Sequence, residues 1–476
     1  MNNFTHKKIG IWGFGVVGQS ALTYFDQQNV ASIEILNRTE VILPSTKTPT
    51  IATMQTEESI QDFLTHNDFI LASPGIPLHD YQQFTHKFIS ELDIYQQNNP
   101  GWPTIAITGS LGKTTITHLL TTILQKNNFA AVAAGNIGEP MLNLLTEQEI
   151  HKNHDATVPA VVSRVGLVVL ELSSFQLQQS QTFAPNLAII TNIYPNHLDH
   201  HKNMQEYEES KYKIFRKQHK KENRKAHIAL LPIELMPFEY DHFFIRSNWA
   251  FFSATKPTKT DMEDLWFQDI YYLENKILLH SHEGKTQQLF DLTTLPPITF
   301  DANWLIIIAA CHLYNIDLSN LATIAQELNI PDHRVQKVGS WNGSNFYNDS
   351  KSTVWQATLQ AVKSMGDKPV KLFLGGLSKG ADRTPLLQAL VSKNIEIYTF
   401  GKEAQDLAQI CKQFNIPHQA HQTLDAAWQA CINTLQSPHE VLFSPGGSSF
   451  DLFADYKARG QYFTQLVENH CKNAQK

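Results

Sequence analysis

The segment Thr108-Gly-Ser-Leu-Gly-Lys-Thr-Thr115 follows the apolar run Thr104–Ile107 and precedes a segment with apolar residues at helical spacing. This order predicts a strand, a glycine loop and the start of an amphipathic helix. Free N–H groups at such a helix start can hold phosphates, while Lys113 neutralises their charge and the Thr114 hydroxyl is a ligand for Mg²⁺. Because Ile107 stands where the longer nucleotide-binding pattern has glycine, the match is to the shorter GxxGK[ST] form.

Two further segments repeat the order of an apolar run and a glycine-rich turn, Ile9–Gly15 and Val370–Gly376. Three such starts in 476 residues predict an α/β fold with three domains. We expect the boundaries near Asn98–Pro103 and Leu295–Ile298, which are rich in loop-forming residues. The predicted domains are a Rossmann-like N-terminal domain at 1–100, a central P-loop mononucleotide-binding domain with a parallel sheet at 101–297, and a Rossmann-like C-terminal α/β domain at 298–476.

Charge and cysteine content exclude several classes of protein. The balance of 38 Lys and Arg against 45 Asp and Glu gives a net charge of -7, which does not favour binding to nucleic acid. The 4 cysteines form no CxxC pair, so the sequence indicates neither a zinc site nor a disulfide framework. The longest apolar runs fall short of the roughly 20 residues that cross a bilayer. We therefore expect a cytoplasmic protein that does not bind a membrane.

Two apolar runs downstream of the glycine loop end in polar residues. Val165–Leu172 contains Glu171 near its end, and Leu187–Ile193 is followed by His197. Both runs read as buried parallel strands, whose carboxyl ends meet at one edge of the sheet. We expect Glu171 and His197 to approach the phosphate loop there, with Glu171 and Thr114 as oxygen ligands of Mg²⁺. For His197, a surface or capping role has about equal weight.

The N-terminal segment Gly13-Phe-Gly-Val-Val-Gly18 is a GxGxxG pattern after a strand, which is typical of a dinucleotide site. The next predicted strand ends in Asn37-Arg38, without the acid that an NAD ribose requires, although Arg38 would suit NADP. A reductase is therefore one alternative hypothesis. A second is an ATP-binding switch or scaffold without catalysis, since the phosphate loop alone would serve either role.

Taken together, the motifs resemble those of the Mur ligases, the ATP-dependent amide-forming enzymes of peptidoglycan precursor synthesis. The resemblance covers nearly the whole chain. It is most specific to the branch that adds D-glutamate to UDP-N-acetylmuramoyl-L-alanine. The segments that carry it are Thr108–Thr115, Gly135–Gly138, Leu170–Leu177, Asn192–Asp199, His333-Arg334 and Asn348–Thr353, with Ser73–Ile76, Ser444–Asp451 and Tyr456–Gly460 for the branch.

The resemblance implies a reaction and its reactants. Family members use ATP and Mg²⁺ to phosphorylate the carboxylate of the nucleotide-linked substrate, and the amine of the amino acid then attacks the acyl phosphate. Such phosphoryl transfer depends mainly on positioning and on neutralising charge. The expected substrates are UDP-N-acetylmuramoyl-L-alanine and D-glutamate, and the expected state is a monomer.

The resemblance also implies roles for individual residues. Lys113, His197 and Lys211 are the expected catalytic residues, and Thr114, Glu171, His197 and Lys211 the expected metal ligands. ATP is expected to contact Gly109, Ser110, Leu111, Gly112, Lys113, Thr114, Thr115, Arg334 and Asp349. The other two substrates are expected to contact Gly15, Val16, Asn37, Arg38, Ser73, Gly75 and Asn136 on the nucleotide-sugar side, and Lys351, Thr353, Lys379, Ser449, Phe450 and Tyr456 on the D-glutamate side.

Lys211 matches the lysine that the family carbamylates, which would turn a cation into an anionic oxygen ligand for the metal. A solvated surface lysine has about equal weight, because Lys211 lies in a lysine-rich segment. Two residues depart from the family pattern. Leu111 stands where the family has Asn or His, and Asn196 stands where it commonly has Asp. We expect both changes to affect rate and metal affinity more than the type of reaction.

Overall fold

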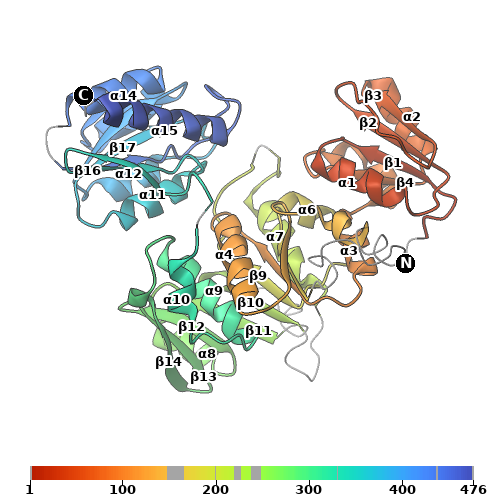
Figure 1. Ribbon diagram of the computed structural model, residues 1–476, viewed down its shortest axis with the longest axis horizontal. Helices are drawn as coiled ribbons and strands as arrows, with labels where there is room; N and C mark the ends of the chain where they lie inside the picture. Colours follow the sequence, from red (N-terminus) through yellow and green to blue (C-terminus); the bar gives the residue numbers. More distant parts are fainter. Residues whose placement is uncertain are drawn as a thin grey trace. The chain divides into compact units, whose positions relative to one another are not determined.

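The computed structural model describes residues 3–146, 166–198, 200–218, 227–236, 248–329, 331–435 and 438–473. Asp199 and most of the lysine-rich segment after Lys217 lie outside these residues. Within them the strands form sheets of five, nine and six strands with helices between them, which confirms an α/β fold with three domains (Figure 1).

The first sheet is entirely parallel, in the order β3-β2-β1-β4-β5. The strand order reverses between β1 and β4, and ligands of such sheets bind beyond the carboxyl ends at that point. Its strands are β1 (Lys8–Trp12), β2 (Ser32–Asn37), β3 (Thr50–Met54), β4 (Phe69–Ala72) and β5 (Phe88–Ile89), and its helices are α1 (Val16–Phe25), α2 (Glu57–His66), the 3₁₀ segment η1 (Leu78–Lys87) and α3 (Glu91–Asn98).

The central sheet has the order β14-β13-β12-β11-β10-β9-β6-β8-β7. It is parallel from β7 to β12 and ends in two antiparallel hairpins. The strands are β6 (Thr104–Thr108), β7 (Ala131–Gly135), β8 (Leu167–Glu171), β9 (Leu187–Ile190), β10 (Ile228–Pro232), β11 (Asn248–Ser253), β12 (Asp269–Glu274), β13 (Ile277–His282) and β14 (Lys285–Asp291). The helices are α4 (Lys113–Lys126), α6 (Ser174–Gln179), α7 (Met204–Arg216), η2 (Ile233–Leu235), α8 (Lys259–Asp264), η3 (Leu292–Thr294), α9 (Asp301–Leu313) and α10 (Leu321–Gln326).

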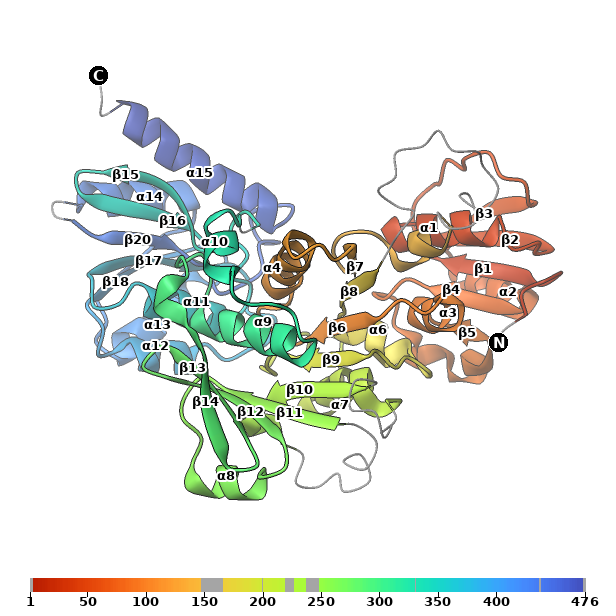
Figure 2. The same ribbon diagram turned by 60° about the horizontal axis from the view of Figure 1, so that its bottom comes forward.

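The third sheet has the order β15-β16-β20-β17-β18-β19, in which only β15 is antiparallel to its neighbour (Figure 2). Its strands are β15 (Gln336–Trp341), β16 (Ser344–Asn348), β17 (Val370–Gly375), β18 (Ile395–Phe400), β19 (His418–Ala420) and β20 (Glu440–Phe443). Its helices are α11 (Trp355–Ser364), α12 (Thr384–Leu390), α13 (Ala404–Gln413), α14 (Leu424–Asn433) and α15 (Tyr456–Asn473).

Burial explains why β6 and β8 are apolar except at their ends. All residues of β6 and β8 are buried, as is usual for parallel strands covered on both faces. On α4 the buried residues recur every three or four positions, from Ile116 through Leu120 to Leu124, and turn one face of the helix to the sheet. The glycine loop between β6 and α4 therefore joins two elements that are anchored in the core.

The structure differs from the predicted domain boundary at residue 297, because helices α9 and α10 follow that residue but pack with the central sheet. Both pack against α4, and α9 also contacts β11 and β12. Residues Asn303–Cys311 of α9 are buried, so this helix needs cover on nearly all sides and finds it beside the central sheet. The chain forms two compact units. One contains the first two sheets and Asp301–Leu328, which includes α9 and α10. The other contains the third sheet together with Tyr194–Met204 and Pro297–Phe300.

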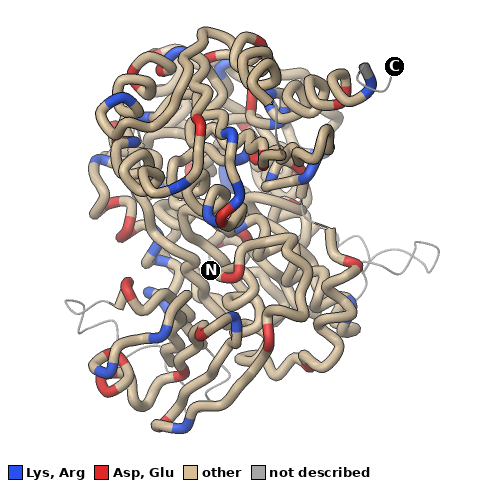
Figure 3. Tube along the Cα trace, turned by 90° about the vertical axis from the view of Figure 1, so that its left-hand side faces the viewer, with Lys and Arg blue, Asp and Glu red and all other residues tan. Residues whose placement is uncertain are grey.

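Positively and negatively charged residues are mixed along the described part of the chain without a long run of one sign: Figure 3 shows Lys and Arg interspersed with Asp and Glu over the trace. Among the described residues, no helix combines the length and the apolar character that crossing a membrane would require.

Helix α3 joins the first sheet to the second and carries two buried carboxylates. Asp93 accepts hydrogen bonds from Ser180 Oγ at 2.8 Å, Gln181 N at 2.9 Å and Thr182 N at 2.9 Å. Glu91 Oε1 accepts one from Met141 N at 3.1 Å. Helix α3 thereby holds the chain on both sides of β8. Met141 lies between β7 and β8, and Ser180 lies after α6, which follows β8.

Replacing Glu91 tests this arrangement through its pH dependence. Burial raises the pKa of Glu91 from 4.5 to about 7, so between these values the folded state binds more protons than the unfolded chain. The free energy of unfolding from this group therefore falls as the pH rises through that window, by on the order of 3 kcal/mol. We expect Glu91→Gln, which stays neutral, to reduce the loss of stability between pH 5 and pH 8, measured as the urea midpoint. Glu58→Gln, at an exposed position of α2, is the control and should leave that loss unchanged.

Candidate active site

The glycine loop has a backbone that only glycine adopts easily. Gly109 has φ +143° and Gly112 has φ +84°, and Gly112 is the residue that precedes α4. A Cβ on Gly109 would lie 2.0 Å from Thr191 Oγ1, and one on Gly112 would lie 2.7 Å from Asn303 Oδ1. The loop is therefore packed closely against the end of β9 and against α9. Ser110, Leu111, Thr114 and Thr115 complete the segment predicted to bind ATP.

Thr191 and Asn192, directly after β9, hold the glycine loop through the backbone N–H and C=O groups of Leu111. Leu111 N donates to Asn192 Oδ1 at 2.8 Å, and Leu111 O accepts from Asn192 Nδ2 at 3.2 Å and from Thr191 Oγ1 at 2.6 Å. Ser110 N donates to Asn192 O at 3.0 Å. Since these bonds use the peptide backbone, the loop keeps its shape although position 111 carries leucine.

Two lysines point to the same backbone carbonyl of the loop. Lys113 Nζ donates to Gly109 O at 2.6 Å, and Lys211 Nζ donates to it at 2.9 Å. Lys211 is 1% exposed and lies over the ring of Tyr207, which bonds Ser110 Oγ at 2.9 Å. Burial and the nearby Lys113 charge lower the pKa of Lys211 well below its ordinary value, although Glu171 opposes this. The structure thus places Lys211 beside the phosphate loop rather than on a solvated helix face.

Glu171 ends β8 next to the loop. Its neighbour across the sheet is Ile107 in β6, and Asn136 Nδ2 donates to Glu171 Oε1 at 2.8 Å. The second oxygen, Oε2, is buried and has no hydrogen-bond partner among the described residues. An unpaired buried carboxylate oxygen suits a hard cation such as Mg²⁺, so the residues present fit the predicted metal.

His197 lies in the segment Tyr194–Met204, which belongs to the second compact unit. It is half-buried and has a left-handed backbone, with φ +57°. Asn196 Oδ1 accepts a hydrogen bond from His197 N at 3.0 Å, so Asn196 serves here to shape the turn. Its approach to Glu171 and the phosphate loop stays a prediction.

At the first sheet, the predicted nucleotide-sugar residues lie at the carboxyl ends of β1, β2 and β4. Asn37 Oδ1 accepts from Phe14 N at 3.1 Å, and Ser73 Oγ donates to Gly13 O at 3.2 Å. These bonds tie together the three loops at the point where the strand order reverses. Gly15, Arg38 and Gly75 lie in the same loops, Val16 is the first residue of α1, and all four are exposed.

At the third sheet, the predicted residues follow β16, β17 and β20. Asp349 is buried; Ser444 Oγ donates to its Oδ2 at 2.6 Å, and burial raises the pKa of this carboxyl to about 7, while Arg334 is among the groups that oppose the rise. Lys351 Nζ lies 3.8 Å from the centre of the Tyr456 ring. Thr353 follows β16, Lys379 follows β17, and Ser449 and Phe450 follow β20, with Ser449 buried and Phe450 66% exposed.

Sequence reasoning assigned no role to several residues that shape these edges. Asn192 holds the phosphate loop, and Arg459 donates to Ser350 O at 2.7 Å and to Gly447 O at 2.9 Å. Asn192 lies in the motif Asn192–Asp199 and Arg459 in the motif Tyr456–Gly460, and this position was the only sequence signal of their role. Arg383 and Glu403 form a third such group, at an ion-pair distance of 2.9 Å.

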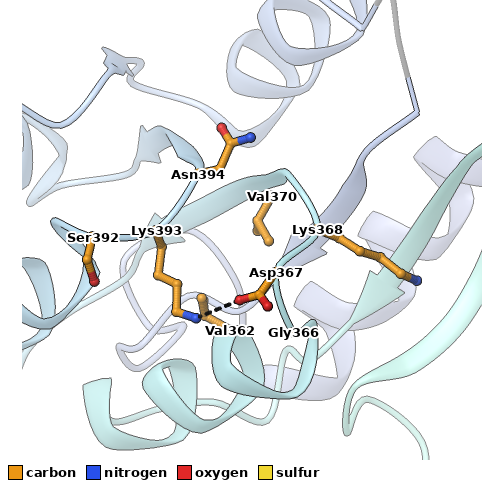
Figure 4. Close-up of a pocket in the computed structure, with 8 residues that line it drawn as sticks. All are labelled: Val362, Gly366, Asp367, Lys368, Val370, Ser392, Lys393 and Asn394. Carbon is orange, nitrogen blue, oxygen red and sulfur yellow. Dashed lines mark ion pairs between the residues drawn. The ribbon is translucent and has the colours of Figure 1, made fainter.

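A hollow in the third domain lies at the opposite edge of its sheet, between the end of α11 and the starts of β17 and β18 (Figure 4). Lys393 points toward Asp367 there, with 3.7 Å between the charged atoms. Because ligands of parallel sheets bind at the carboxyl ends, this hollow is not part of the candidate site.

The chain is similar in sequence to known proteins. The Mur ligase middle domain matches residues 107–304. A protein of Protochlamydia amoebophila named UDP-N-acetylmuramoylalanine–D-glutamate ligase is 28% identical, over 98% of this chain and 99% of its own length. A protein of the same name from Haemophilus influenzae is also 28% identical, over 98% and 99%. The chain thus resembles the Mur ligases over its central part and these named ligases over nearly its whole length.

A comparison with solved structures shows a shared fold. The MurF ligase of Thermotoga maritima, solved in complex with ADP, superposes with a TM-score of 0.54 at 13% identity, over 99% of this chain and 96% of that one. The relatives named as ligases confirm the ligase class expected from the sequence and favour it over a reductase. The family is ATP-dependent, which is consistent with a phosphate loop in the matched region.

Because the position of Gly109 is so closely packed, we expect one added methyl group there to weaken nucleotide binding. Gly109→Ala would place its Cβ against Thr191 Oγ1 and strain the backbone, so the protein should lose at least about tenfold in affinity for ATP, measured with a fluorescent analogue. Gly366→Ala is the matched control, because Gly366 also has positive φ but nothing lies within 4 Å of its Cβ position. Equal affinity in both variants would contradict a phosphate role for the loop.

Proposed function

We propose that this protein is the ATP-dependent ligase that joins D-glutamate to UDP-N-acetylmuramoyl-L-alanine through an acyl phosphate, in peptidoglycan precursor synthesis in the cytoplasm. The observation that carries the proposal is the cluster at the end of β6, where Lys113 and Lys211 meet one loop carbonyl beside the unpaired oxygen of Glu171. The full-length similarity to relatives of that name supports the choice of substrates.

The residues of this cluster suit phosphoryl transfer. The loop amides and Lys113 would hold the phosphates of ATP, and their positive charge would offset the charge that develops on the transferred group. Glu171 and Thr114 would hold Mg²⁺, which would supply positive charge to neutralise the phosphates of ATP. Asn136 fixes one oxygen of Glu171, which leaves the other available to a cation.

The third domain would supply the amino acid. Lys351, Lys379, Thr353, Ser449, Phe450 and Tyr456 follow strands of one sheet edge, and two lysines match the two carboxylates of glutamate. Packing of Lys351 over Tyr456 holds its ammonium group in one place. The first domain would bind the uridine diphosphate at the loops that Asn37 and Ser73 join.

The proposed activity is tested by phosphate release. We expect turnover with ATP, Mg²⁺ and UDP-N-acetylmuramoyl-L-alanine to depend on D-glutamate and to be absent with L-glutamate, L-alanine or diaminopimelate. Turnover with one of the other acceptors would reassign the substrate, ATP binding without turnover would favour the switch, and oxidation of NADPH would favour the reductase.

Lys211 provides a second test. Burial and the Lys113 charge lower the pKa of Lys211, which favours the neutral amine, the form that reacts with carbon dioxide to give a carbamate. We expect Lys211→Ala to lose nearly all turnover and a small carboxylic acid in the buffer to restore part of it, because the acid replaces the missing carboxylate. Lys217→Ala, on the same segment, is the control. Full activity of Lys211→Ala would refute the role, and loss without rescue would refute the carbamate.

A further inference from the structure

The loop after β17 has an unusual backbone at the residue predicted to bind the amino acid. Lys379 has φ +53°, and its neighbours in the loop, Gly376 and Gly380, have φ +69° and +78°. A lysine rarely adopts the left-handed region, so the surrounding structure must hold it there. This loop therefore requires anchors besides its own turns.

Arg383 provides one of these anchors. Its Nη1 donates to Gly375 O at 3.1 Å, and its Nη2 donates to Gly376 O at 2.6 Å. The residue is 4% exposed, so its guanidinium group is held among backbone carbonyls rather than in water. A planar guanidinium can bind several acceptors at fixed angles, which a lysine cannot do.

Glu403, in the segment after β18, provides the second anchor of this loop. Its carboxylate accepts from Ser378 N at 3.0 and 3.1 Å and from Ser378 Oγ at 3.2 Å. Arg383 Nη2 donates to Glu403 Oε2 at 2.9 Å. The residue directly before Lys379 is thus bonded to the same ion pair that holds the start of the loop.

We propose that Arg383 and Glu403 are positioning residues of the amino-acid site, which set the place of Lys379 and thereby the affinity for the dicarboxylic acceptor. This inference rests on the proposed function. Neither residue is a catalytic residue, since both act on the loop backbone. A misplacement of about 1 Å in such a site can cost on the order of a hundredfold in efficiency.

Variants of the pair separate positioning from stability. Removing one partner of a buried ion pair leaves the other charge unpaired and destabilises the fold, whereas replacing both is often tolerated. We expect Arg383→Met and Glu403→Gln each to lower the melting temperature, and the double variant to regain most of it. The KM for D-glutamate should rise about tenfold or more in all three, while the KM for ATP stays within about twofold. Arg383→Lys should restore only part of the affinity, because lysine lacks the planar fork.

Lys393→Met is the matched control. It breaks an ion pair of the same domain at the amino ends of the strands, where Lys393 faces Asp367 (Figure 4), and should leave both KM values unchanged. A double variant that regains both its melting temperature and its KM for D-glutamate would refute the proposal, because the pair would then serve stability alone.

Hydrogen exchange tests the inference independently of activity. Amides of residues 376–380 should exchange faster in Arg383→Met than in wild type, and at the wild-type rate in Lys393→Met. If wild type shows no D-glutamate-dependent turnover, the proposed function fails, yet the exchange result still decides whether the pair holds the loop. Unchanged exchange in an active enzyme would overturn the positioning role alone.

Discussion

Parallel pairing of β6 with both β8 and β9 determines where the chemical groups of the central domain lie. Ile107 pairs with Glu171 on one side, and Thr108 pairs with Ile190 on the other, so the three strands end level with one another. A shift of one residue would turn Glu171 to the opposite face of the sheet, since side chains alternate along a strand. The glycine loop, the segment after β9 and Glu171 are neighbours because of this register.

The groups around the phosphate loop are charged and poorly solvated. Lys211 and Glu171 are each 1% exposed, and Lys113 donates to the same carbonyl as Lys211. Burying charge without a partner is costly, so such a cluster is kept where function requires it. Backbone carbonyls and Asn136 satisfy part of the hydrogen-bonding capacity, and the remaining oxygen of Glu171 is the place where a cation would complete it.

Much of the fold was accessible from local pattern. Apolar runs and glycine turns predicted the α/β class and located β1, β6 and β17, because parallel strands are buried on both faces and ligand loops follow them. The placement of α9 was not accessible, since its cover depends on α4, which lies far away in the sequence. Asn192, Arg383, Glu403 and Arg459 were missed as structural groups for the same reason: their partners are loops of other strands.

The sequence by itself determined the type of chemistry: a GxxGK[ST] loop between a strand and a helix has few uses other than holding phosphates, because its free amides and its lysine are suited to anions. It could not distinguish a solvated Lys211 from a buried one, because a lysine in a basic helix is usually exposed. Only the tertiary structure decided this, by packing α7 against the loop so that the Lys211 ammonium lost water and met Gly109 O, which lowers its pKa. Burial depends on contacts between distant segments, and local sequence does not record them.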